Sequence, residues 1–254
     1  MPVASWIVDI ALGAALGFLG GLFGTGGGVI LIPLLGLFFG YTQQVAQGTA
    51  MVTVVSNVYV GAWLYARRHD IPIRLGLALG TASLLFTYVA ARIAVVMDPQ
   101  LLRGCFAVFL AGVACLLMWK GFFAPGEVTA GAPRFGRKWL PALGVPLGLI
   151  GGFLGVGMGA ITPPILTGLF GMTQVVAQGL TLTLAVPSVT VFLITFGHAG
   201  LVNWQVGLLI AVGGLVTLNA GVALAHRLPE RKLRGTFGVF LLISALALLL
   251  ASLR

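Results

Sequence analysis

The residues with the most unusual chemistry form one short run, Gly24-Thr25-Gly26-Gly27-Gly28. Four glycines in five positions cost a helix interior roughly 1 kcal/mol each relative to alanine, so we expect a helix to break here. A helix that begins just after the break, near Val29, would turn unpaired N–H groups toward the loop. Such a helix terminus favours an anion by about 0.3 to 2 kcal/mol. The run therefore predicts a small pocket for an anion.

A second run of the same kind lies later in the chain, at Gly155-Val-Gly157-Met-Gly159. We expect another break here, with a new helix near Ala160. Val156 and Met158 replace Thr25 and Gly27, which predicts that the two half-sites differ in chemistry. No βαβ pattern surrounds either run, so a nucleotide-binding glycine loop is not supported.

Polar side chains that could complete a site follow each run. Gln47 and Gln178 are the best candidates, because both halves of the chain retain this glutamine directly before a glycine. Further candidates for substrate binding are Thr49, Asn57, Thr181 and Ser188. The alternative is that these side chains bond to neighbouring helices, at about 0.6 kcal/mol each. The sequence leaves both interpretations open.

The composition identifies the solvent around these segments. Of 254 residues, 59% are hydrophobic and 7% are charged, and the mean hydropathy is +1.11. A soluble domain carries about 25% charged residues, so a soluble enzyme, a disordered chain and a disulfide scaffold are excluded. The two cysteines lie in one apolar stretch, and we expect neither a metal cluster nor a cofactor. The net charge of +9 is spread over short clusters between apolar runs, which indicates membrane topology and not nucleic-acid binding.

Polar residues divide the chain into spans of about 20 residues, the length that crosses a bilayer. Six spans are plain, at 44–66, 73–96, 101–121, 175–197, 204–225 and 232–253. Two longer regions, 10–40 and 139–171, are interrupted by the glycine runs. Each reads as two short arms, although a full first helix from Val3 followed by a half helix also fits the length. The residues 122–138 read as a polar linker.

The chain is an internal duplication with an offset of 131 residues. From Leu12 to Gly48, 20 of 37 positions are identical to their partners in the segment 143–179. We therefore predict an all-α polytopic membrane protein built from a first repeat (1–121), the linker and a second repeat (139–254). Each repeat would contain one glycine-broken helical hairpin and three transmembrane helices. Duplicated folds of this kind are typical of secondary transporters, with the binding site near the midplane.

Charge asymmetry favours inverted repeats. With three crossings per repeat, 11 of the 14 Lys and Arg residues fall on one face and 3 on the other, whereas four crossings would divide them 8 against 6. The positive-inside rule then places the linker in the cytoplasm and both termini outside, in the periplasm. The five acidic residues, Asp9, Asp70, Asp98, Glu127 and Glu230, are all expected at span ends or in loops. No central carboxylate is then left to neutralise a cation, so cation transport is not favoured.

The run at 20–28, with Pro33 and Gln47-Gly48, resembles the sulfite exporter TauE/SafE family, also called the 4-toluene sulfonate uptake permeases. The resemblance covers nearly the whole chain. It implies a carrier in the prokaryotic inner membrane that moves sulfite, sulfonates or related small anions by alternating access. Its partners would be the anionic substrate, the lipid bilayer and, in some arrangements, a second copy of the chain. An anion channel is the alternative, and an intramembrane enzyme is poorly supported because no nucleophile and base stand together.

Overall fold

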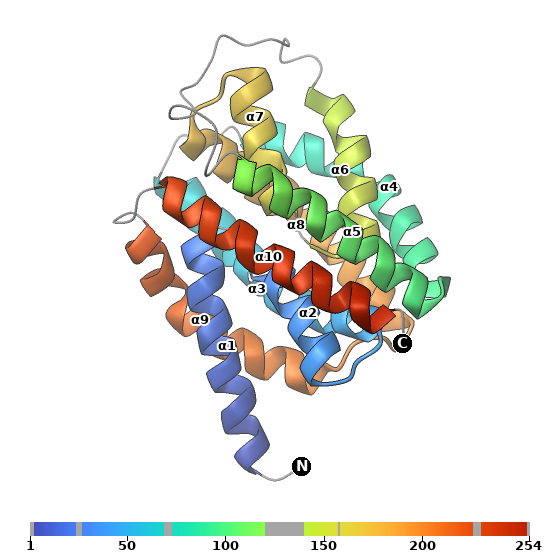
Figure 1. The fold of residues 1–254 in the computed structure, drawn as a ribbon. Helices are drawn as coiled ribbons and strands as arrows, with labels where there is room; N and C mark the ends of the chain where they lie inside the picture. Colours follow the sequence, from blue (N-terminus) through green and yellow to red (C-terminus); the bar gives the residue numbers. More distant parts are fainter. Residues whose placement is uncertain are drawn as a thin grey trace. The chain divides into compact units, whose positions relative to one another are not determined.

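A computed structural model describes residues 3–23, 27–68, 73–119, 140–156, 158–225 and 230–252 (Figure 1). Within them the regular structure is helical throughout, as predicted. The helices are α1 (Val3–Phe23), α2 (Gly28–Phe38), α3 (Gln43–Arg68), α4 (Ile73–Val96), α5 (Pro99–Met118), α6 (Leu140–Leu154), α7 (Thr162–Phe170), α8 (Gln174–His198), α9 (Trp204–Ala225) and α10 (Glu230–Ser252), with a 3-10 turn at Met158–Ala160.

Seven helices among the described residues are long and apolar enough to cross a membrane. Six of them, α3, α4, α5, α8, α9 and α10, correspond to the six predicted spans. Their outer faces carry large apolar side chains in the open, such as Leu85 at 65% exposure and Val216 at 76%. Contiguous apolar exposure of this kind is expected where lipid is the solvent.

The seventh candidate span is α1, and it decides between the two alternatives for the first region. The helix begins at Val3 and has 21 residues, which is about 32 Å at 1.5 Å per residue. Asp9 lies in the first turn of the candidate span Trp6–Phe23 and is 5% exposed. The first copy therefore has the longer of the two alternatives, a full-length helix followed by the short α2.

The helices gather into two compact units, and each unit draws on both predicted repeats. The first unit contains 1–53, 96–125 and 201–254, which includes α1, α2, the start of α3, α5, α9 and α10. The second unit contains 54–95 and 126–200, which includes the rest of α3, nearly all of α4, and α6, α7 and α8. The repeat boundaries at 121 and 139 stay a prediction, and the linker 122–138 lies outside the described residues.

In the first unit, α1 packs closely on α9 (Figure 1). A Cβ added at Gly13 would collide with the backbone of Ile210, and one added at Gly17 with the backbone of Gly214. The Thr217 hydroxyl strengthens this seam by donating a hydrogen bond to the Ala14 carbonyl. Small residues let two backbones approach in this way, as the spacing of the glycines by four predicts.

The second unit contains the matching seam, between α6 and α4. A Cβ added at Gly144 would lie 3.0 Å from the Leu79 carbonyl oxygen, and one added at Gly148 would lie 2.6 Å from the Ser83 carbonyl oxygen. The duplication offset of 131 relates the two seams. It matches Gly13 to Gly144 and Gly17 to Gly148, and it matches their partners Ile210 to Leu79 and Gly214 to Ser83. Each repeat therefore packs its glycine face on a helix of the other repeat.

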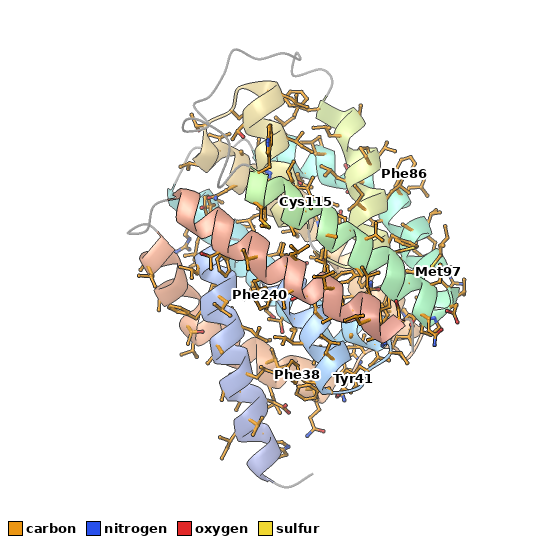
Figure 2. All side chains as sticks on the ribbon, viewed as in Figure 1. Phe38, Tyr41, Phe86, Met97, Cys115 and Phe240 are labelled. Carbon is orange, nitrogen blue, oxygen red and sulfur yellow. The ribbon has the colours of Figure 1, made fainter. Side chains whose placement is uncertain are left out.

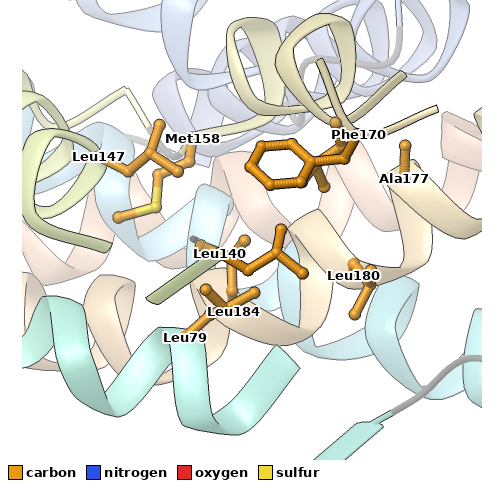
Figure 3. Close-up of a cluster of buried hydrophobic side chains, with 9 residues drawn as sticks. Leu79, Leu140, Leu147, Met158, Phe170, Ala177, Leu180 and Leu184 are labelled. Atoms are coloured by element: carbon orange, nitrogen blue, oxygen red, sulfur yellow. The ribbon is translucent and has the colours of Figure 1, made fainter. Parts of the chain in front are cut away.

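The second unit also holds a large apolar core (Figure 3). Its buried members are Leu79, Leu140, Leu147, Met158, Leu166, Phe170, Ala177, Leu180 and Leu184. They come from α4, α6, α7, α8 and the 3-10 turn. Met158 brings the second glycine run into contact with this core.

Candidate functional site

The first glycine run breaks the chain as predicted. Helix α1 ends at Phe23 and α2 begins at Gly28. Gly27 has a φ of 84°, in the left-handed region that side-chain-bearing residues rarely adopt. Gly24, Thr25 and Gly26 lie outside the described residues, so their predicted contact with substrate stays a prediction.

Helix α2 begins inside the protein and ends at its surface. Gly28 to Pro33 are all buried, whereas Phe38 at the other end is 78% exposed (Figure 2). The Ile30 and Leu31 N–H groups donate to the Gly27 carbonyl, and no side chain caps the terminus. The positive end of the α2 dipole is therefore held in a buried place, where its field is weakly screened.

Two glutamines in the first turns of α3 lie in the same unit. Gln43 and Gln47 are both fully buried, and among the described residues neither the nitrogen nor the oxygen of either amide has a hydrogen-bond partner. The buried Thr53 hydroxyl, further along α3, is also without a partner. A buried polar group left unpaired costs about 1 to 3 kcal/mol, so four such amide atoms are a cost that the fold alone does not explain.

Thr49 and Asn57, two other candidates, are also buried on α3. The Thr49 hydroxyl accepts a hydrogen bond from the Asn203 N–H at 3.0 Å, which ties α3 to the start of α9. Thr49 thus has a structural role that the sequence did not show. Asn57 belongs to the second compact unit.

The second glycine run is also broken, but it is packed with side chains. Helix α6 ends at Leu154, Gly155 has a φ of 65°, and α7 begins at Thr162, two residues after the expected Ala160. Two consecutive prolines in the first turn of α7 suit a helix start there. The Phe192 ring covers Gly155, and the Met158 side chain lies against Gly151. Gly159 is half-buried, and Gly157 lies outside the described residues.

The polar candidates of the second copy already have partners. The Tyr65 hydroxyl donates to Gln178 Oε1 at 2.6 Å. The Thr181 hydroxyl donates to the Ala177 carbonyl at 2.7 Å, and the hydroxyls of Ser188 and Ser83 are 2.7 Å apart. For Ser188, the alternative of a bond to a neighbouring helix agrees with the structure, since Ser83 lies on α4. The Thr181 bond stays within α8, so neither interpretation of Thr181 is decided by it.

Three further polar residues were missed by the sequence analysis. Gln43 and Thr53 lie in the first unit, and Thr162 opens α7 with a fully buried hydroxyl that has no partner. A signal for Gln43 was present, since Gln174 repeats it at the offset of 131. Thr53 and Thr162 have no such counterpart, because Leu184 and Leu31 occupy the matching positions.

The structure thus gathers Gly27, Gly28, Gln47 and Thr49 in one unit, and Asn57, Gly155, Gly159, Gln178, Thr181 and Ser188 in the other. The convergence of both breaks on one midplane site stays a prediction. In the described part of the chain, no group of three or more His, Cys, Asp or Glu residues could hold a metal ion.

Comparison with known proteins gives a consistent result. The family model described as "Sulfite exporter TauE/SafE" matches residues 10–248. A probable membrane transporter protein of Xylella fastidiosa (strain Temecula1) is 30% identical over 97% of this chain and 95% of its own length. The probable membrane transporter MJ0441 of Methanocaldococcus jannaschii is 25% identical over 92% and 94%, and YunE of Bacillus subtilis is 22% identical over 89% and 91%. No solved structure matches the chain.

Proposed function

This chain belongs to the sulfite exporter TauE/SafE family of membrane transporters, and on that premise we propose that it carries a small sulfur-containing oxyanion, such as sulfite or an organosulfonate. Transport proceeds by alternating exposure of a buried site to the two sides of the inner membrane. The linker faces the cytoplasm and both termini face the periplasm, in keeping with the distribution of Lys and Arg.

The buried, unpartnered amides of Gln43 and Gln47 are the observation that carries the proposal. Each amide offers two N–H donors, and an oxyanion offers several acceptor oxygens. A bound oxyanion would satisfy donors that the protein leaves unpaired. It would also release the cost of burying them, which supports binding of a polar ligand at this place.

The uncapped start of α2, in the same unit, supports a negative charge on that ligand. Gly27 and Gly28 carry no side chain that could block the approach of a ligand to the helix terminus. A Cβ at Gly27 would have only the Leu16 carbonyl nearby, at 3.6 Å. In our proposal the amides provide hydrogen bonds, and the α2 dipole provides the positive potential that no central Lys or Arg supplies.

Flux measurements in proteoliposomes test this function. Sulfite uptake should saturate with concentration and should be accelerated by unlabelled sulfite on the opposite side of the membrane. A channel, the second candidate, would show neither saturation nor counterflow. Absence of any flux of sulfite, sulfate, thiosulfate, taurine and sulfoacetate from the active, folded protein would contradict the proposal.

A further inference from the structure

Arg103 differs from the other arginines whose side chains the structure describes. Arg67, Arg74 and Arg92 are exposed, whereas Arg103, one turn into α5, is half-buried. Its Nε atom is buried and has no hydrogen-bond partner in the part of the chain that the structure describes. A guanidinium carries five N–H donors and a permanent charge, so an incomplete set of partners in a buried place is costly.

The Arg103 side chain is held where three connections of the first unit meet. Its Nη2 donates to the Tyr41 carbonyl at 3.3 Å, in the turn between α2 and α3. The Tyr41 hydroxyl in turn accepts a hydrogen bond from Asn203 Nδ2 at 3.0 Å, just before α9. Gln44 Nε2 donates to the Met97 carbonyl at 2.7 Å, which fixes the start of α3 to the turn before α5. Tyr41 and Met97 are labelled in Figure 2.

No carboxylate in the described part of the chain neutralises this charge. The hydrogen bond to Tyr41 is the contact that Arg103 makes there. The nearest acid along the chain, Asp98, is exposed and is used as the cap of α5, accepting from the Gln100 and Leu101 N–H groups. A partly buried cation without a carboxylate partner is stabilised when an anion from outside pairs with it.

The groups closest to Arg103 along the contacted turn have the same polarity. Tyr41 is followed within two residues by the N-terminus of α3, a helix of 26 residues. Gln43 opens that helix with an amide that is fully buried and unpartnered. A guanidinium fork, a helix N-terminus and an amide are each donors suited to an oxyanion.

We propose that Arg103, with the first turn of α3 and the Gln43 amide, forms a second binding site for a small oxyanion. Arg103 is the charged anchor of the site, and it holds the anion where α3 and α5 begin. The site adjoins the transport site and shares the Gln43 amide with it, since Gln43 lies one helical turn before Gln47 on α3, whereas Arg103 belongs to the second site alone. This second site rests on the proposed function only for the identity of the anion, since the Arg103 chemistry would also suit a phosphate of a lipid headgroup.

The test is equilibrium binding of sulfate to the purified protein in detergent, with chloride at equal ionic strength as the reference. The Gln47→Leu variant serves as the background, because it removes the transport site and leaves Arg103 in place. We expect this variant to be stabilised by sulfate in a thermal shift assay. Adding Arg103→Gln to this background should raise the half-saturating sulfate concentration by about tenfold or more, as expected for a lost charged hydrogen bond.

Two further variants keep the test decisive. Arg103→Lys retains the charge without the planar fork, so it should bind sulfate with intermediate strength. Arg92→Gln removes an exposed charge elsewhere and should bind like the background. Equal binding by the Arg103→Gln and background proteins would overturn the proposal, as would an equal loss in Arg92→Gln. A shift that only phosphatidylglycerol produces, and that depends on Arg103, would reassign the site to lipid.

The result is separable from the transport experiment. Flux without Arg103-dependent binding would leave the proposed function standing and remove the second site. Binding that depends on Arg103, in a protein that moves no sulfite, would leave the second site standing and contradict the proposed function.

Discussion

The two glycine breaks come from nearly identical sequence and are surrounded by different chemistry. At the first break, the nearest atom to a Cβ placed on Gly27 is a backbone carbonyl at 3.6 Å. At the second, a Cβ on Gly155 would lie 2.8 Å from the Phe192 ring, and Met158 occupies the position that matches Gly27. Among the described residues, the space beside Gly27 is therefore open, whereas Gly155 is packed against an aromatic ring.

The glutamines that follow the breaks differ in the same sense. Gln47 is buried without a partner, and its counterpart Gln178 is half-buried and bonded to Tyr65. Duplication has preserved the backbone design in both copies, because helix breaks and glycine seams are needed twice. The side chains have diverged, and the polar groups with unused hydrogen-bonding capacity remain mainly with the first copy. We therefore expect substrate binding to depend on the two copies unequally.

The largest effect is expected where the copies agree. Gly17→Val and Gly148→Val should each prevent folding or strongly lower the unfolding temperature, because the opposing backbones of α9 and α4 leave no room. Monodispersity and thermal unfolding in detergent measure this. Gly112→Val is the control, since its added side chain would meet nothing within 4 Å. A tolerated Gly17→Val would show that the seams are not equivalent.

The next effect separates the copies. Gln47→Leu should reduce sulfite flux by about tenfold or more, while raising the unfolding free energy by about 1 to 3 kcal/mol, since an unpaired buried amide is removed. Gln178→Leu should lower the unfolding free energy by about 1 kcal/mol, because it deprives the Tyr65 hydroxyl of a partner, and should leave flux nearly unchanged. Initial rates in proteoliposomes and chemical unfolding give both readouts. Equal flux defects in the two variants would contradict an unequal site.

A smaller effect compares the breaks themselves. Gly27→Ala should cost about 1 to 2 kcal/mol, the price of a left-handed backbone for a side-chain-bearing residue. Gly155→Ala should cost more, because the same strain is joined by the collision with Phe192. Combining Gly155→Ala with Phe192→Leu should recover the difference between the two single variants. A purely additive double variant would argue against the contact.

The smallest effect concerns a polar contact that Ser83, a residue of the second seam, makes with α8. Ser83 pairs with Ser188 in the second unit, whereas the position that matches Ser83 in the first unit is Gly214. Ser83→Ala should destabilise the protein by about 0.6 kcal/mol, the average for such bonds between membrane helices. The KM for sulfite should not change. A raised KM would return Ser188 to the list of binding residues.

The local features of this fold could be predicted from the sequence. Dense glycine predicted both breaks, because its backbone cost holds in any surroundings, and apolar length predicted six spans. The start of α1 was left open between Val3 and Ile10, because length alone does not separate a full helix from a short arm. The partners of the glycine faces could not be predicted, since nothing in the local pattern of Gly13 or Gly144 indicates that its neighbour lies in the other repeat.

The candidate site shows the same division. Gln47 was identifiable because repetition singled it out, and the unlike filling of the two breaks followed from Met158 in place of Gly27. The sequence could not show that Tyr65 satisfies Gln178, since the two residues are 113 positions apart. Nor could it show that Arg103 is half-buried, because a position one turn into a predicted span normally reaches the lipid interface.

The hydroxyls of Tyr59 and Thr190 lie 2.9 Å apart, and these residues are 131 positions apart, so they are the same position in the two copies. In a symmetric dimer, residues that contact their own counterparts lie on the two-fold axis. A half-length chain with this contact would meet a second copy of itself at the same position. In the duplicated chain both partners lie within one polypeptide, and the two positions already carry different residues, tyrosine and threonine.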